Sequence, residues 1–209
     1  MCSDQACLGY TLLAIIAGFA GLIFFLLKYR KRFLEANLQI TAEQVWSEVV
    51  NRGYKANFSK SDLLFGVWQD RSSTETSLVV KNHKNEVVGR VDFPLGIRKF
   101  KISVGQEIFD VEFPLTWRRT AHLRAANSKL ILASYFKINI FGKHQFKIPN
   151  YGTIMAKRPN LSQRLIFEYG LNNILIGASQ EISPRQQIGR IIILPSNMPL
   201  QLKIFILAL

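Results

Sequence analysis

Apolar residues form one unbroken run near the amino terminus, from Leu8 to Leu27. The run carries no charge, and its polar side chains, Tyr10 and Thr11, both fall in what would be the first helical turn. A helix of this length rises about 30 Å, which matches the hydrocarbon thickness of a bilayer. A buried core helix can be equally apolar but is rarely this long. The pattern therefore predicts a transmembrane helix over residues 8–27.

The charges that flank this run predict its orientation. Residues 1–7 contain Asp4 and no lysine or arginine, whereas four membrane-proximal basic residues follow the run: Lys28, Arg30, Lys31 and Arg32. The positive-inside rule places residues 1–7 outside and residues 28–209 in the cytoplasm. A cleavable signal peptide would need a basic start and a shorter apolar region, so we predict an uncleaved, single-pass anchor. Alanine and glycine at a spacing of four inside the run leave a homodimer open.

A short amphipathic helix is predicted within the basic juxtamembrane segment 28–53. Thr41 and Gln44 have the spacing of a capping box, which marks the start of a helix. Over residues 42–52 the apolar side chains fall on one stripe, and Gly53 suits a helix end. We expect this helix to pack on the outside of the following domain or near the membrane.

After Tyr54 the apolar positions alternate or form short runs instead of following a helical period. Gly105 and Gln106 separate two such runs as a two-residue hairpin turn would. Strands at this regular, short spacing indicate an antiparallel sandwich or barrel. The strands are expected at residues 63–68, 77–80, 87–93, 99–104, 107–113, 120–125, 130–139, 145–148, 152–157, 164–169, 174–178 and 187–194.

The last ten residues form an apolar segment of another kind. Residues 200–209 are apolar on every side apart from Gln201 and Lys203, and the segment is too short to cross a bilayer. A helix that is apolar all round must be enclosed by protein. We therefore predict a mainly β domain over residues 54–209, in which about twelve antiparallel strands close around this helix. The helix residues expected in the barrel core are Leu200, Leu202, Ile204, Phe205 and Leu207.

A four-residue pattern occurs twice in the β region. Residues 88–91 read Val-Gly-Arg-Val and residues 188–191 read Ile-Gly-Arg-Ile, and each is followed by a proline, Pro94 and Pro195. The repeat favours a duplicated barrel.

This order of elements resembles the tubby carboxy-terminal-like superfamily, which includes tubby proteins, phospholipid scramblases and LURP-one-related proteins. Residues 187–194 correspond to the last strand, residues 199–209 to the central helix, and the Gly-Arg repeat to an internal pseudo-repeat. The resemblance covers residues 55–209 and implies a closed barrel of about twelve strands. Tubby proteins bind phosphoinositides through basic residues. Scramblases place their membrane span after the barrel and carry a cysteine-rich run and an acidic calcium loop, which this chain lacks.

Positive charge is concentrated in the second half of the domain. The chain has 27 lysines and arginines against 14 acidic residues, and ten of those bases but only one acid, Glu168, lie between Phe113 and Gln180. Such an excess attracts anionic lipid headgroups, and less readily nucleic acid, since a tethered domain lies beside the leaflet. A solvated face that only maintains solubility is the alternative. The candidate lipid contacts are Trp117, Arg118, Arg119 and Arg124.

Catalytic and metal-binding patterns are missing from the sequence. Both cysteines, Cys2 and Cys7, lie before or at the edge of the apolar run, so the domain has no disulfide or thiolate metal site. The three histidines are far apart in sequence, and we expect them in turns or on the surface. Asp110 and Glu112 have the spacing of an acid–base pair, but the solvent face of a strand explains them better.

These observations predict a membrane-anchored protein that is not an enzyme and needs no cofactor or metal. Its basic barrel would contact anionic phospholipid or a protein partner, in the membrane or at its cytoplasmic face, as a binding or scaffold module. The alternative is lipid handling, in which the barrel binds a lipid or moves it between leaflets. A nucleic-acid role is disfavoured, since the basic residues lack a recognisable recognition fold.

Overall fold

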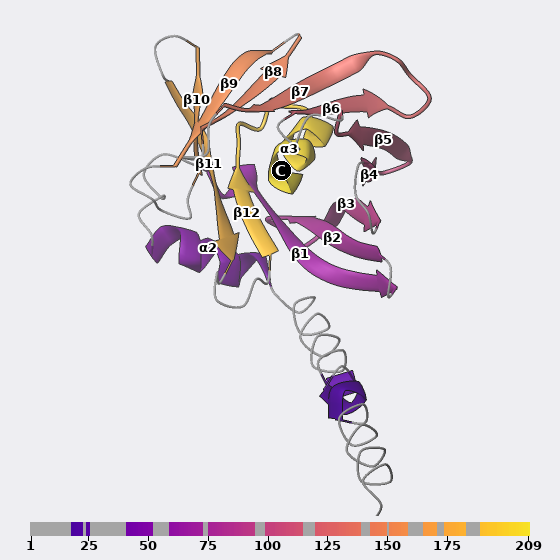
Figure 1. The fold of residues 1–209 in the computed structure, drawn as a ribbon. Helices are drawn as coiled ribbons and strands as arrows, with labels where there is room; N and C mark the ends of the chain where they lie inside the picture. The colour runs from indigo at the N-terminus through magenta and orange to yellow at the C-terminus, as the bar shows by residue number, and fades with distance from the viewer. Residues whose placement is uncertain are drawn as a thin grey trace, which may run out of the picture.

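The computed structural model describes residues 18–22, 24–25, 41–51, 59–72, 75–94, 99–114, 120–138, 143–149, 151–158, 165–170, 174–182 and 189–209. Two helices, α2 and α3, and a short 3-10 turn, η1, accompany twelve strands (Figure 1). The helical elements are α2 Ala42–Asn51, η1 Lys60–Asp62 and α3 Leu200–Ala208. The strands are β1 Leu63–Ser72, β2 Glu75–Asn82, β3 Val87–Pro94, β4 Lys99–Val104, β5 Glu107–Glu112, β6 Thr120–Ala125, β7 Ile131–Lys137, β8 His144–Ile148, β9 Gly152–Lys157, β10 Leu165–Tyr169, β11 Ile174–Ile182 and β12 Gly189–Ile193.

The twelve strands form one closed antiparallel barrel, as the sequence predicts. Each strand pairs with its neighbour in sequence, and β1 pairs with β12 to close the ring, with Leu63 opposite Ile193 and Val67 opposite Gly189. All twelve predicted strands are present, although β1, β2 and β11 run further than expected. The polar residues after Trp68 still pair with β2, because backbone groups form the ladder whatever the side chains are.

Helix α3 occupies the interior of the barrel (Figure 1). Its side chains at Leu202, Ile204, Phe205 and Leu207 are buried, and Leu200 packs against the same core, so the predicted core helix is confirmed. Phe205 packs edge-on against Phe146 of β8 at a centroid distance of 6.2 Å. Because the helix is apolar all round, the strands must surround it to remove it from water.

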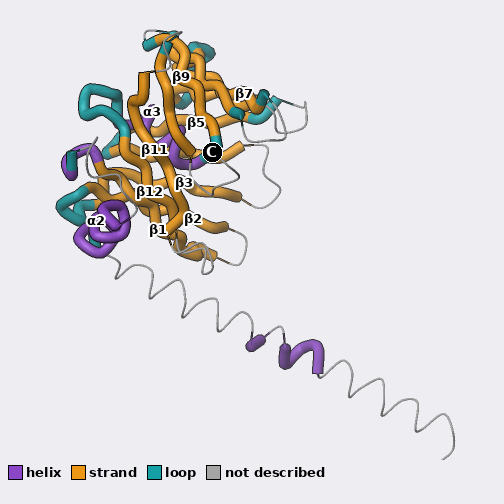
Figure 2. Tube along the Cα trace, turned by 90° about the vertical axis from the view of Figure 1, so that its left-hand side faces the viewer, coloured by secondary structure: helices purple, strands orange, loops and turns teal. Residues whose placement is uncertain are grey.

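A second, smaller core lies outside the barrel, under helix α2. Helix α2 lies beside β1 and β12 on the outside of the barrel (Figure 2). Its residues Ala42 and Val45 are buried in one cluster with outward-facing side chains of β1, β2, β11 and β12, such as Phe65 and Ile193. The predicted capping box is present: the Thr41 N–H donates to Gln44 Oε1 at 3.0 Å, and the Gln44 N–H donates to Thr41 Oγ1 at 3.4 Å. These strands are therefore buried on both faces, which accounts for their continuous apolar runs.

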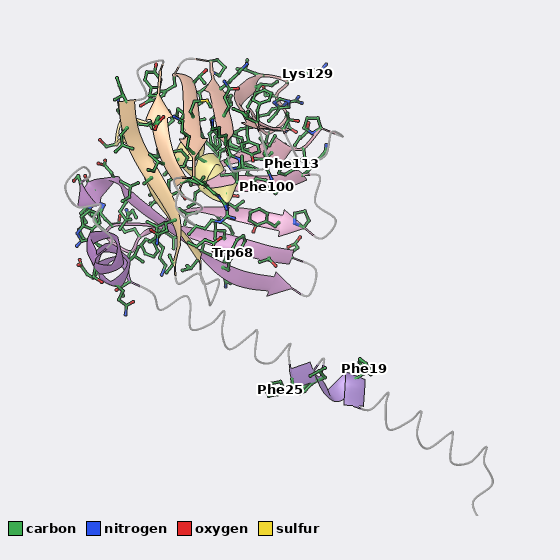
Figure 3. The ribbon with its side chains drawn as sticks, turned by 60° about the vertical axis from the view of Figure 1, so that its left-hand side comes forward. Phe19, Phe25, Trp68, Phe100, Phe113 and Lys129 are labelled. Atoms are coloured by element: carbon green, nitrogen blue, oxygen red, sulfur yellow. The ribbon has the colours of Figure 1, made fainter. Side chains whose placement is uncertain are left out.

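The predicted membrane span is described only at residues 18–22 and 24–25, which are helical. Phe19 and Phe25 project from this helical stretch and are 63% and 64% exposed (Figure 3). Within the described parts of the chain, no helix is both long and apolar enough to span a bilayer. The membrane-proximal residues Lys28, Arg30, Lys31 and Arg32 lie outside the described residues.

The two Gly-Arg patterns do not occupy equivalent positions in the barrel. In β3, Gly89 lies opposite Val80, whose side chain is part of the interior core, so Arg90 points outward. In β12, Arg190 lies opposite Gly66, an inward-facing position, so the arginine points inward. The two arginines therefore face opposite sides of the barrel wall, so the sequence match is not a structural repeat and does not support a duplication.

Gly89 is a point of close approach between the barrel wall and α3. A Cβ added here would lie 2.4 Å from Ile204 Cδ1 and 2.9 Å from the Ser103 carbonyl oxygen. Both distances are too short for atoms that are not bonded to one another, so a side chain would push the helix or strand β4 aside.

We predict that Gly89→Ala lowers the free energy of unfolding by about 1–3 kcal/mol, because it overpacks the interior. Chemical denaturation measures this change. Ile204→Val removes the clashing Cδ1, so Gly89→Ala with Ile204→Val should cost less than the sum of the two single substitutions. Strict additivity would contradict the close contact.

Candidate functional site

The residues predicted to contact lipid are not brought together by the described part of the chain. Trp117, Arg118 and Arg119 lie outside the described residues. Arg124 lies on the outer face of β6, where its Nη1 is 3.2 Å from Glu112 Oε2. Lys99 Nζ is 2.6 Å from the other oxygen of the same carboxylate. Arg124 is thus half-buried in an ion pair within the barrel wall.

The acid–base pair considered in the sequence is part of this outer network. The pKa of Glu112 is lowered, mainly because its carboxylate accepts a hydrogen bond from Lys99, and the charges of Lys99 and Arg124 add to the effect against opposing burial. A carboxylate held ionised by two cations is a poor proton donor. Its neighbour Asp110 lies opposite Lys101 of β4 and Arg124 of β6. Asp110 and Glu112 are therefore better explained as charged side chains on the solvent face of β5 than as an acid–base pair.

A polar cavity of about 70 Å³ lies at one end of the barrel, beside the carboxy-terminal end of α3. Its wall comes from β7, β8, β10, β11 and β12 and from the residue that follows β9. Odd-numbered strands of an antiparallel barrel all finish at the same end, so the ends of β7, β9 and β11 meet there. The charged and polar side chains at this end include Tyr135, His144, Arg158, Ser179, Glu181 and Arg190.

Arg190 projects from β12 into this cavity and supports α3. Its Nη1 donates a hydrogen bond to the carbonyl oxygen of Leu207 at 3.3 Å. The last carbonyls of a helix lack intrahelical partners, and a cation there also complements the helix dipole. Burial lowers the pKa of the Arg190 guanidinium, an effect opposed by Glu181, which lies directly opposite on β11, and reinforced by Arg158.

Tyr135 and His144 form a hydrogen-bonded, stacked pair in the same cavity. The Tyr135 hydroxyl is 2.8 Å from His144 Nδ1, and the two rings stack with centroids 5.6 Å apart. Burial raises the pKa of the Tyr135 phenol, although the charges of Arg158 and Arg190 oppose this effect. Burial also lowers the pKa of His144, and Arg158 and Lys137 lower it further. A protonated phenol and a neutral imidazole each carry one proton, and their hydrogen bond uses one of the two, so the pair keeps one further donor, the Nε2–H or the phenol O–H.

Arg158 follows β9 and is exposed at the mouth of the cavity. Within the described residues it has no hydrogen-bond or ion-pair partner. Its charge acts on Tyr135, His144 and Arg190, and in each case it lowers the pKa. The mouth of the cavity is therefore a region of unbalanced positive potential.

The opposite half of the same barrel end is apolar. A row of aromatic rings crosses β1, β3, β4 and the end of β5, from Trp68 through Phe93 and Phe100 to Phe113, with centroid distances of 5.3, 4.9 and 5.8 Å (Figure 3). These rings pack against the interior core. The polar cavity is thus confined to the half of the barrel formed by β7 to β12.

The hydrogen-bond donors that line the cavity are suited to binding an anionic group. In the described part of the chain, no three histidine, cysteine or acidic side chains come close enough to hold a metal ion. The raised pKa of Tyr135 keeps its phenol protonated, so it is not an activated nucleophile. The cavity offers N–H and O–H donors, including those of the guanidinium groups of Arg158 and Arg190, and such donors suit an anionic group.

This site was missed in the sequence because its residues are scattered over four strands and one loop. His144 was expected in a turn or on the surface, and this was wrong: it lies in β8, half-buried against Tyr135. His122 is likewise half-buried in β6, 2.9 Å from Ser134 Oγ, whereas His83 does lie in a turn. The available signal was a polar residue at an inward position of an otherwise apolar strand, as at Arg190.

Comparisons with protein-family models, with curated proteins and with solved structures find no match for this chain.

We predict that the protein loses stability as the pH falls from 7.5 to 5.5. The folded state lowers the pKa of His144 and of His122, so the unfolded chain binds protons more readily below about pH 6.5 and is favoured there. His144→Gln should flatten this dependence, as measured by denaturation at each pH. His83→Gln, in the turn between β2 and β3, is the matched control. An unchanged pH profile for His144→Gln would contradict the assignment.

The two Gly-Arg patterns provide a second prediction. Arg190→Gln should lower the free energy of unfolding by about 1–3 kcal/mol, because it removes the bond to Leu207 and leaves Glu181 without its cation. Arg90→Gln should cost less than about 1 kcal/mol, since Arg90 lies on the outer face beside Gln69 and Asp92. Thermal or chemical denaturation compares the two, and equal losses would refute the inward position of Arg190.

Proposed function

We propose that this chain is a single-pass membrane protein that is not an enzyme, with a basic barrel that binds anionic lipid at the cytoplasmic face. The observation that carries the proposal is the charge imbalance between Phe113 and Gln180, with ten basic residues and one acid. Several of these bases are exposed, among them Lys129, Lys137 and Lys147. The one acid, Glu168, lies 2.5 Å from Lys157 and so balances a single charge.

The membrane anchor is supported by the apolar run of residues 8–27 and by its described portion. Phe19, Leu22, Phe24 and Phe25 are helical, and each is more than half exposed. Water disfavours a helix that exposes large apolar side chains in this way, whereas lipid favours it. The lack of lysine and arginine before the run supports an outer amino terminus, with the barrel on the cytoplasmic side.

The proposed family is the tubby carboxy-terminal-like superfamily. A closed barrel of twelve antiparallel strands around an apolar carboxy-terminal helix is the arrangement that the resemblance implies, and the chain has both parts. The support is architectural, and the binding role is argued from the charges of this chain alone.

Lipid handling inside the barrel is less well supported than binding at its surface. Helix α3 and the inward side chains fill the interior core. The polar cavity at the barrel end, at about 70 Å³, has no room for an acyl chain. A lipid would therefore contact the barrel through its headgroup.

We predict that residues 40–209 bind vesicles containing anionic lipid and that this binding weakens as salt is raised, because screening shortens the reach of each charge. Both hydrophobic cores lie within residues 42–207, so this fragment retains the complete packing. Arg118→Gln with Arg119→Gln should lower the partition coefficient about tenfold or more, at about 1 kcal/mol for each charge removed. Co-sedimentation across a salt series measures it.

Arg90→Gln with Lys60→Gln removes the same charge from positions already paired, to Gln69 and Glu43, and is the control. Equal binding to neutral and anionic vesicles, or no binding at low salt, would reject the lipid role. In that case the exposed bases would point to an acidic protein partner.

A further inference from the structure

We propose that the cavity at the carboxy-terminal end of α3 is a binding site for a phosphate group, held between Arg158 and Arg190 against the Tyr135–His144 pair. This site lies at one end of the barrel, and it shares Arg158 with the ten bases counted above, whereas Arg190 lies outside that count. The inference does not depend on membrane attachment.

The charges around the cavity favour an anion on one particular side. Arg158 and Arg190 both act on Tyr135, and Arg158 and Lys137 both act on His144. Within the described residues, no carboxylate is among the charges that shift either group. Glu181 faces Arg190 from β11 on the other side of the cavity. An anion beside the Tyr135–His144 pair is therefore near two cations, and the acidic side chain of the lining, Glu181, lies on the far side next to Arg190.

Several hydrogen-bond donors around this position have no acceptor among the described residues. Arg190 gives one hydrogen bond, from Nη1 to Leu207, and Glu181, opposite it on β11, acts on its guanidinium through charge. Arg158 has no acceptor at all among the described residues. The hydrogen bond between Tyr135 and His144 uses one of their two protons, which leaves the pair one further donor, the imidazole Nε2–H or the phenol O–H. Two guanidinium groups and this donor supply more hydrogen bonds than the two oxygens of a carboxylate accept, and the three terminal oxygens of a phosphate group match them better.

The size and walls of the cavity limit the ligand. A volume of about 70 Å³ is several times the 10–15 Å³ that one water requires, so the cavity has room for a phosphate group. The lining also includes apolar side chains, among them Phe146, Leu165 and Ile206, beside the polar residues of β11. Apolar walls lower the local dielectric constant and strengthen the attraction between the guanidinium groups and the anion.

Substitution of Arg158 tests anion binding without disturbing the fold. Arg190 also holds the end of α3, so its removal affects stability as well as the cavity. Arg158 is exposed and makes no such contact with the described fold. The contribution of Arg158 to anion binding can therefore be measured in a variant whose barrel stays folded.

The test is a calorimetric titration of the full-length chain, in neutral detergent at low salt and pH 7.5, with inorganic phosphate. We expect binding at millimolar concentration, weakened about tenfold by Arg158→Gln, since a hydrogen-bonded ion pair is lost. Lys129→Gln removes the same charge from an exposed turn and should leave the affinity within about twofold. Phosphate should also raise the pKa of His144 in a histidine NMR titration, and Arg158→Gln should remove that effect.

Two further arms identify the source of the phosphate group. If Arg158→Gln weakens the binding of glycerol 3-phosphate and also of phosphatidate vesicles, the site takes a lipid headgroup. If it weakens only the soluble phosphates, the site takes a free phosphate ester. Either result supports the site. No phosphate binding by the wild-type chain, or equal binding by Arg158→Gln, would overturn it. Because the phosphate titration contains no anionic lipid, failure of the lipid-surface proposal leaves this result unaffected.

Discussion

The structure depends on the enclosure of one helix that has no polar side. Helix α3 buries six consecutive residues, Leu202 to Leu207, and one of them is Lys203, whose pKa is lowered by burial and raised in part by Asp62. An amphipathic helix could lie on an open sheet, but this one would expose apolar surface in any position except the centre of a ring. Closure of β1 on β12 meets that requirement, and Gly89 allows the wall to approach the helix closely.

Burial of polar groups beside this helix is tolerated because they satisfy one another. Arg190 satisfies a carbonyl of α3, Tyr135 satisfies His144, and Glu181 faces Arg190 across two paired strands. Burying any one of these groups without a partner would destabilise the folded state, because its lost hydrogen bonds to water would not be replaced. The polar groups of this cluster therefore pair with one another at the end of the barrel. Arg158 is a cation without a partner among the described residues.

Much of the fold could be predicted from the sequence, because alternation and all-round apolarity are local signals. All twelve strands, the turn at Gly105 with its positive φ of 59°, and the capping box at Thr41 follow from neighbouring residues. The extra length of β1 could not be predicted, since backbone pairing to β2 overrides its polar side chains. The repeated Gly-Arg pattern misled, because a shift of one residue reverses which side chain faces inward.

The candidate site could not be predicted in the same way. Tyr135, Arg158 and Arg190 are brought together only by the order of strands around the ring and by the end at which each strand finishes. The spacing of residues along one strand indicates neither the order of the strands around the ring nor the end at which each strand finishes. The basic residues near Arg118 drew attention because they are adjacent in sequence, whereas the cavity draws its charges from distant segments.

Closure of the ring also restricts how another molecule can bind this barrel. Each of the twelve described strands has a neighbour on both sides, so the backbone groups that an open sheet offers along its edges are already paired. A partner peptide cannot join this barrel by adding a strand, which is how many β domains capture extended segments. Recognition must pass through side chains and the strand connections, and this same lack of an edge protects the barrel from joining a second copy strand to strand.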